Sequence, residues 1–167
     1  VEPKSGSQMG VEKKRVKELV PPAVKFPYIK MGRSISGFRL NQTGGKFGPF
    51  ENQFFLGDYS LSLIVRATTE QINGVWQGAC YPFREGLATG IMNVEFSPKG
   101  QLFAGGFTTS RQWPVRGTEP FALQRIDWNG VVPFEIQEIN IKKDGFLVTF
   151  TKAIDKQVAA RTDAYTI

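Results

Sequence analysis

The stretch NVEFSPKGQLFAG, from Asn93 to Gly105, decides the fold class. Val94 and Phe96 alternate with polar neighbours, which is the period of a strand that buries one face. Residues 97–100 (SPKG) fit a type I turn, because Pro98 presets the backbone angle φ at the second turn position. An apolar run follows the turn. The stretch therefore predicts two strands joined by a tight turn.

The same pattern recurs along the chain. Apolar and polar residues alternate over Leu61–Arg66 and over Phe146–Thr151, which indicates half-buried strands. Asn73-Gly74 and Asp144-Gly145 each separate two apolar runs. Such dipeptides are typical of hairpins, because both residues tolerate positive φ. No long helix is indicated, so the sequence predicts an all-β fold.

Two segments of the chain repeat one another. Phe55 and Phe103 are 48 positions apart, and their surroundings match once an insertion at Lys46–Asn52 is allowed. The matched residues are Gly45, Gln53, Phe54, Phe55 and Gly57 with Gly100, Gln101, Leu102, Phe103 and Gly105. In the first copy the predicted first and last strands are Ser36–Leu40 and Leu61–Arg66. In the second copy they are Ile91–Phe96 and Phe121–Trp128.

A repeat of roughly 40–50 residues with about four strands is typical of a β-propeller blade. Its inner strands are crowded, which favours small residues such as Gly57, Gly105 and Gly106. A ring needs at least about four blades, and this chain supplies two. We expect the remaining blades to lie on another chain, or the chain to be a fragment.

The chain divides into three parts by composition. Residues 1–23 form a basic lead-in with a predicted short helix over Val11–Leu19, residues 24–132 form the blades, and residues 133–167 form a tail. The net charge is +6, from 21 basic and 15 acidic residues, and seven of the basic residues fall in the first thirty. We interpret the lead-in as solvated. Nucleic-acid binding is disfavoured, because the basic residues are not interleaved with aromatic ones.

Several classes of chemistry are excluded by residue types that the chain lacks. It contains no histidine, which rules out a haem attachment motif, a Ser-His-Asp triad and most zinc sites within it. Its one cysteine, Cys80, is predicted to be a core thiol, and Trp76 and Trp128 to pack between blades. The sequence contains neither a run long enough to span a membrane nor a cleavable signal pattern.

Three segments resemble a known family. They are Gly44–Asp58 (GGKFGPFENQFFLGD), Gly78–Gly90 (GACYPFREGLATG) and Gly117–Glu138 (GTEPFALQRIDWNGVVPFEIQE). They are similar to the planctomycete and verrucomicrobial sugar-dehydrogenase-like propeller proteins, which are related to soluble quinoprotein glucose and sorbosone dehydrogenases. The resemblance covers about Val24–Ile167.

The resemblance implies a six-bladed propeller in the periplasm or at the cell surface. It implies oxidation of a sugar or alcohol, with electrons passed to a cytochrome c domain or partner, and pyrroloquinoline quinone (PQQ) held by Ca²⁺ and basic side chains. It also implies that Phe134–Ile167 opens an immunoglobulin-like domain.

The chain departs from this family at the quinone site. Where the relatives present two arginines to the quinone carboxylates, this sequence has Gly90 and Met92. Neither residue can supply charge-assisted hydrogen bonds. The catalytic histidine and the calcium ligands of that group belong to earlier blades. No cofactor, metal site or catalysis is therefore expected from this chain alone.

Arg84 and Glu85 are the first candidate ligand-binding residues. They follow a predicted strand and precede a glycine-rich stretch, so they are expected in a loop at a channel mouth. Arg84 would contact an anionic or sugar ligand, and Glu85 would orient it. The alternative is an ion pair that ties two blades together.

Arg111, Trp113 and Arg116 are candidates in the predicted loop Thr108–Thr118. An aromatic ring flanked by guanidinium groups can stack on a sugar face. The alternative is a loop that packs on its neighbour. Arg33, Ser34 and Ser36 are predicted to enter an inner strand and line the channel, and Asp58 is either a ligand or a turn cap.

Two functions stay open at this point. The first is a wall of a sugar or alcohol dehydrogenase whose chemistry lies in other blades. The second is a non-catalytic propeller that serves as a binding or scaffold module in a cell-surface or multi-subunit assembly.

Overall fold

The computed structural model describes residues 9–16, 18, 20–108 and 113–164. Within these residues the fold is all-β, with three antiparallel sheets, none of which closes on itself. The first sheet has the order β1-β2-β3-β4, the second β5-β6-β7 and the third β8-β9. The strands are β1 Ile35–Leu40, β2 Phe54–Asp58, β3 Leu63–Ile72, β4 Val75–Arg84, β5 Ile91–Phe96, β6 Leu102–Phe107, β7 Phe121–Ile126, β8 Ile136–Lys142 and β9 Gly145–Phe150.

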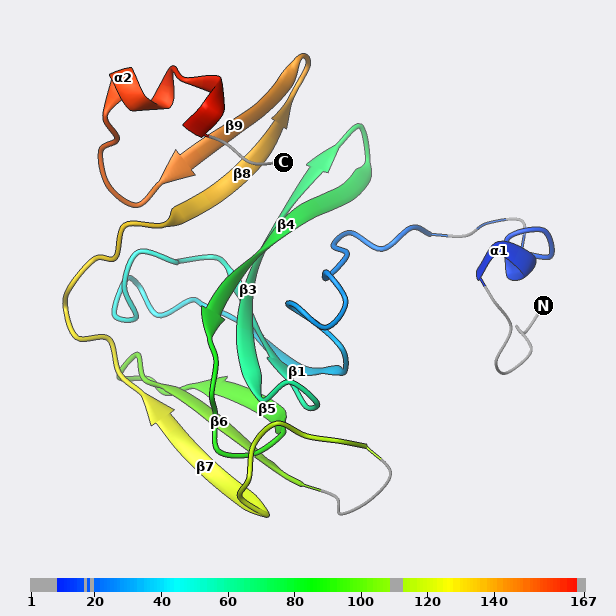
Figure 1. The fold of residues 1–167 in the computed structure, drawn as a ribbon, viewed down its shortest axis with the longest axis vertical. Helices are drawn as coiled ribbons and strands as arrows, with labels where there is room; N and C mark the ends of the chain where they lie inside the picture. Colours follow the sequence, from blue (N-terminus) through cyan, green and yellow to red (C-terminus); the bar gives the residue numbers. More distant parts are fainter. Residues whose placement is uncertain (1–8, 17, 19, 109–112, 165–167) are drawn as a thin grey trace.

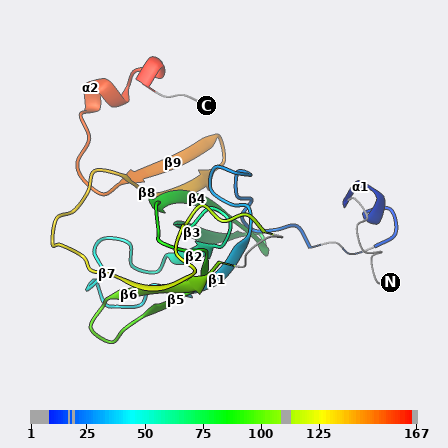
Figure 2. The same cartoon turned by 60° about the horizontal axis from the view of Figure 1, so that its bottom comes forward.

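The three sheets lie in layers, with the first sheet between the second sheet and the β8–β9 hairpin (Figures 1 and 2). Helix α1 (Met9–Glu12) lies apart from the layers, whereas α2 (Lys156–Ala159) and a 3₁₀ turn (Thr162–Ala164) follow β9. The predicted helix over Val11–Leu19 is wrong in extent, since α1 ends at Glu12. In the part of the chain that the structure describes, no helix has the length and apolar character of a membrane span.

The predicted hairpins are confirmed, with one shift of register. Ile72 pairs with Val75, so Asn73 and Gly74 form the two-residue turn, with φ of 50° and 81°. Such positive φ at both positions is what a type I′ turn requires. In the last hairpin Lys142 pairs with Gly145, so the turn residues are Lys143 and Asp144 rather than Asp144 and Gly145.

The first two sheets repeat the same strand arrangement. Phe55 is the second residue of β2, opposite Arg39 on β1 and Arg66 on β3. Its counterpart Phe103 is the second residue of β6, opposite Glu95 on β5 and Arg125 on β7. The strands β1, β2 and β3 are thus equivalent to β5, β6 and β7. The first sheet has a fourth strand, β4, and the second has none in the described residues.

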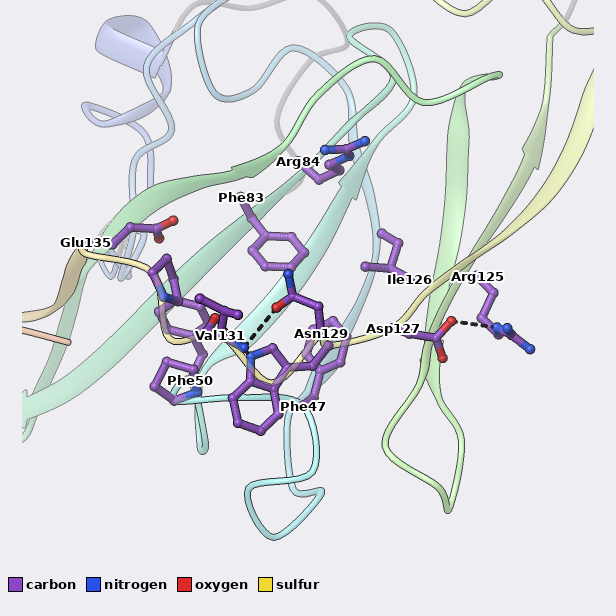
Figure 3. A pocket seen from close by; sticks show the side chains of 13 residues that line it. Phe47, Phe50, Phe83, Arg84, Arg125, Ile126, Asp127, Asn129, Val131 and Glu135 are labelled. Atoms are coloured by element: carbon purple, nitrogen blue, oxygen red, sulfur yellow. Dashed lines mark hydrogen bonds and ion pairs between the residues drawn. The ribbon is translucent and has the colours of Figure 1, made fainter. Parts of the chain in front are cut away.

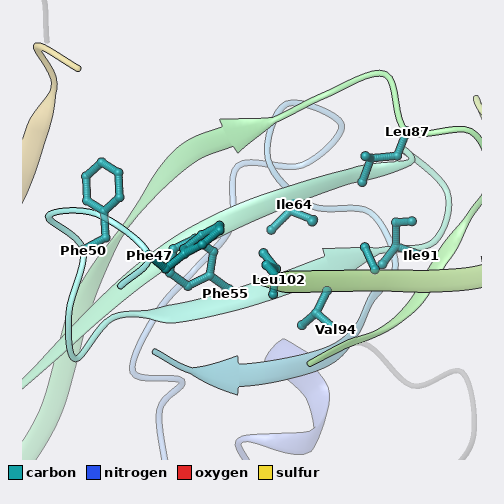
Figure 4. Close-up of a cluster of buried hydrophobic side chains, with 9 residues drawn as sticks. Phe47, Phe50, Phe55, Ile64, Leu87, Ile91, Val94 and Leu102 are labelled. Carbon is teal, nitrogen blue, oxygen red and sulfur yellow. The ribbon is translucent and has the colours of Figure 1, made fainter. Parts of the chain in front are cut away.

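The main core lies between the first two sheets (Figure 4). It joins residues of the first sheet and its loops to residues of the second sheet in one buried cluster. Its members are Phe47, Phe50, Phe55, Ile64, Leu87, Ile91, Val94, Leu102 and Ala104. Phe47, Phe55 and Phe96 pack edge-to-face with ring centroids 5.2–5.5 Å apart. Burial of apolar area at this contact is what holds the two sheets together.

Strand β3 is buried on both faces, which differs from the half-buried strand that its alternation predicted. One face joins the main core through Ile64, and the other packs Leu63 and Val65 against Phe26 and Met31. The segment before β1 therefore covers the second face of the sheet. Alternation alone could not reveal this cover, because it lies more than thirty residues away in the sequence.

The outer face of the second sheet is open. Phe103, Phe107, Phe121 and Leu123 share this face, because residues two apart on a strand, and residues opposite one another on neighbouring strands, point the same way. Phe121 is 76% exposed and Leu123 is 74% exposed. We call Phe103, Phe121 and Leu123 the open face; Phe107, at the end of β6, contacts the Tyr59 ring instead. Such apolar exposure is typical of a surface that packs against another part of a protein.

Predicted core residues at the edges of the sheets are also exposed. Trp76 lies at the tip of the β3–β4 hairpin and is exposed in this chain, and Trp128 is partly exposed beside Gly48. Cys80 is half-buried rather than a full core thiol, with its Sγ 3.8 Å from the Lys25 carbonyl oxygen, and burial raises its pKa. The predicted burial of Trp76, Trp128 and Cys80 would need neighbours that the described residues do not include.

Small residues allow the first two sheets to approach closely. A Cβ atom on Gly37 of β1 would lie 2.7 Å from the Cα of Asn93 on β5. Gly37→Ala is therefore expected to lower the free energy of unfolding by about 1–3 kcal/mol through overpacking. Gly145→Ala is the control, because nothing lies within 4 Å of the added methyl group. Urea denaturation of both variants measures the difference, and equal losses would contradict the close contact.

Candidate functional site

Residues from both sheets meet in a shallow pocket beside β1 and β5. The described residues that line it are Ser34, Ser36, Tyr59, Met92, Phe107 and Trp113. We call it the Trp113 pocket; its volume is about 260 Å³. The Tyr59 and Phe107 rings meet edge-to-face with centroids 6.3 Å apart, and the Trp113 side chain is 57% exposed. Three of the predicted site residues, Ser34, Ser36 and Trp113, are thus brought together.

The lining of the Trp113 pocket suits a ligand with an apolar face. Exposed Trp113 offers the flat surface on which the C–H face of a sugar ring stacks. Phe107 and Met92 extend the apolar surface, and Ser34 contributes a hydroxyl group. Among the described residues the lining offers aromatic rings, a thioether and hydroxyl groups, which suit binding of such a ligand.

Ser36 and Asp58 are used inside the fold. The Ser36 Oγ lies 2.5 Å from the Ile91 carbonyl oxygen and 3.2 Å from that of Gly57, so it links β1 to the second sheet. Asp58 is fully buried, and its carboxylate accepts hydrogen bonds of 2.7 Å from the backbone N–H groups of Arg33, Ser34 and Leu61. These contacts favour the turn-cap interpretation of Asp58 over the ligand interpretation.

The remaining candidates are spread over separate places. Glu85 and Arg116 line one cleft of about 420 Å³. Arg84 is the last residue of β4 rather than part of a loop as predicted, and it lines another cleft. Neither Arg84 nor Glu85 forms an ion pair within the described residues. Arg33 contacts Asp58 through its backbone and does not line the Trp113 pocket. Arg111 lies outside the described residues.

The ion pair that does join the two sheets is formed by other residues. The Arg39 Nε on β1 lies 2.5 Å from the Glu95 Oε2 on β5. Both side chains are about half exposed, so this pair contributes little to stability.

Arg66 is the buried charge that the sequence interpretation passed over. Its side chain is 1% exposed, and its guanidinium group lies 3.7 Å from the centroid of the Phe50 ring. It donates to the Gln53 Oε1 at 2.6 Å, to the Glu135 Oε2 at 3.1 Å and to the Ile136 carbonyl oxygen at 3.2 Å. Burial lowers the pKa of Arg66, and Glu135 acts against that shift. Arg66 thereby attaches β8 to the first sheet.

Two further side chains support this attachment. The Tyr81 hydroxyl accepts a 2.8 Å hydrogen bond from the Ile139 backbone N–H, and burial raises the pKa of Tyr81. Glu70 accepts a 2.8 Å hydrogen bond from the Ile141 N–H, and this bond lowers the pKa of Glu70. A charged residue in the middle of the apolar run LSLIVRATT was the sequence signal for this cluster.

The residues present do not fit PQQ. Gly90 is buried against Tyr59, and a Cβ at position 90 would lie 2.7 Å from the Cδ2 of that ring, so an arginine has no room there. Met92 lines the Trp113 pocket and carries no charge. Across the described ranges, no group of three or more Cys, Asp or Glu side chains is placed to hold a metal ion.

Comparison with known proteins identified no relative. Neither a protein family, nor a curated protein, nor a solved structure matched this chain.

Proposed function

We propose that the chain forms two consecutive blades of a larger β-propeller, and that the Trp113 pocket binds a sugar or alcohol on the channel wall of that propeller. The parent would be an extracytoplasmic sugar-dehydrogenase-like protein, in the periplasm or at the cell surface, that passes electrons to a cytochrome c domain or partner. The observation that carries the binding role is the meeting of Ser36 and Trp113 in one apolar pocket beside β1 and β5.

The equivalence of the two sheets supports the propeller. Phe55 and Ile64 pack on the second sheet, and their counterparts Phe103 and Leu123 lie on the open face. A further sheet packed on the open face would bury these two residues as the second sheet buries Phe55 and Ile64. Repetition of this contact around an axis is the geometry of a propeller. The immunoglobulin-like assignment of residues 133–167 stays part of this proposal; their strands form the β8–β9 hairpin.

Loss of the Trp113 ring tests the binding role. Trp113→Ala is expected to weaken binding of methyl glucoside, measured by saturation-transfer NMR, by about tenfold, because the stacking surface is removed. Trp76→Ala is the matched control, since Trp76 is also exposed but lies at the tip of the β3–β4 hairpin. Equal affinity in the wild type and Trp113→Ala would contradict the proposal, as would absence of binding by the wild type at millimolar sugar.

A non-catalytic scaffold is the second candidate. It is favoured by the poor fit of Gly90 and Met92 to a quinone and by the structural hydrogen bonds of Asp58. Dye-linked oxidation of sugars and alcohols by the parent protein, with PQQ and Ca²⁺ supplied, separates the two candidates. Activity would exclude the scaffold. No activity and no change in melting temperature with PQQ would exclude the dehydrogenase.

A further inference from the structure

Strand β7 ends its sheet, whereas its counterpart β3 is a central strand. β3 pairs with β2 on one side and with β4 on the other. β7 pairs with β6, and within the described residues its other edge has no partner strand. Such an edge presents unpaired N–H and C=O groups, which are a template for another strand.

A cleft lies beside the C-terminal end of β7 (Figure 3). It has a volume of about 530 Å³ and is lined on one side by Phe83 and Arg84 of β4 and on the other by residues 125–129. Phe47 and Phe50 add aromatic surface. We call it the Trp128 cleft. Because the two sheets stack face to face, a fourth strand beside β7 would stand opposite β4, and its inward side chains would enter this cleft.

The first sheet indicates which side chains such a strand would carry. Arg66 on β3 is paired with Tyr81 on β4, and its guanidinium group lies 5.0 Å from the centre of that ring. Arg125 is the counterpart of Arg66, because Arg125 lies opposite Phe103 and Arg66 lies opposite the equivalent residue Phe55. The guanidinium group of Arg125 binds Asp127 at 2.8 Å and is about half exposed, so it is accessible to an aromatic side chain.

We propose that the free edge of β7 and the Trp128 cleft together accept an extended peptide strand. The strand runs antiparallel to β7, places apolar side chains in the cleft, and carries an aromatic residue beside Arg125. This inference deepens the propeller part of the proposed function, because it names the partner of the second sheet. It does not depend on sugar binding in the Trp113 pocket.

The probe is a synthetic peptide that copies β4 (VWQGACYPFR) with serine in place of Cys80. Hydrogen exchange of the full chain is measured with and without it. We expect amides of residues 121–126 to exchange about tenfold more slowly in its presence, because strand pairing protects them. Exchange in β1 is expected to stay unchanged. Absence of protection of β7 by the peptide would overturn the proposal. So would protection of β7 in the absence of peptide that increases with protein concentration, because it would indicate pairing between two copies of the chain.

Two peptide controls separate strand pairing from adhesion to the open face. Each carries N-methyl groups on alternate residues, so that one loses the N–H groups that face β7 and the other loses those that face away. One methylated peptide is expected to bind at least tenfold more weakly than the other. Equal binding of the two would overturn the proposal.

Arg125→Ala provides the final test. It is expected to weaken binding of the tyrosine peptide about threefold to fivefold and to leave unchanged the binding of a peptide with alanine in place of that tyrosine. Equal losses for the two peptides would overturn the placement of the aromatic residue. Methyl glucoside binding, measured on the same samples, reports on the Trp113 pocket separately.

Discussion

Phe55→Ala is expected to lower the free energy of unfolding by about 3–5 kcal/mol, whereas Phe103→Ala is expected to cost about 1 kcal/mol or less. The two residues are equivalent in the repeat, but Phe55 is 0% exposed and packs between the first two sheets. Phe103 lies on the open face and is only partly buried, so its removal exposes less enclosed space. Urea denaturation followed by tryptophan fluorescence measures both values.

The Phe55 and Phe103 pair also tests the repeat itself. A loss of about 3–5 kcal/mol is a large part of the stability of a small domain, so Phe55→Ala should unfold at a clearly lower urea concentration than the wild type. Similar losses for the two variants would contradict the finding that only one copy of the repeat is covered. Phe121→Ala is the control for a general effect of removing an aromatic residue from a strand, since Phe121 is highly exposed.

Arg66→Met is expected to lower the free energy of unfolding by about 3 kcal/mol and to release the β8–β9 hairpin. The substitution keeps much of the apolar volume but leaves the buried side chain of Gln53 and the Ile136 carbonyl without their guanidinium donor. Limited proteolysis in residues 127–135, together with hydrogen exchange of β8, measures the release of the hairpin.

Glu135→Gln is the control for the Arg66 prediction. Its side chain is 42% exposed, so loss of this ion pair alone is expected to cost less than about 1 kcal/mol. If Glu135→Gln were as damaging as Arg66→Met, the attachment would depend on charge pairing rather than on the buried hydrogen bonds and ring contacts. If Arg66→Met left the hairpin protected, the Tyr81 and Glu70 contacts would suffice to attach it.

Local signals predicted the strands and turns well. The Asn73-Gly74 turn and the SPKG turn lie where expected, because turn geometry depends on residues within four positions of one another. The second sheet begins with β5 at Ile91–Phe96, as its alternation predicted. The one-residue shift of the turn in the β8–β9 hairpin has the same local origin. Either Lys143 and Asp144 or Asp144 and Gly145 can form the two-residue turn, and the structure has the first pair.

The candidate site was only partly predictable. Ser36 and Trp113 were both named as candidates, but their meeting depends on which strands adjoin, and no local pattern encodes that. Arg66 was passed over because its partners Gln53, Glu135 and Ile136 lie 13, 69 and 70 positions away. Arg84 and Glu85 were paired as neighbours in sequence, yet Arg84 ends β4, Glu85 begins the following loop, and the two line different clefts.

By itself, the sequence determined the all-β class, the hairpins and the repeat that relates Phe55 to Phe103. The tertiary structure decided which copy of the repeated face is covered. The local pattern is the same at the two positions, but burial requires a second surface. The second sheet covers Phe55 completely, whereas the described residues leave Phe103 only partly buried.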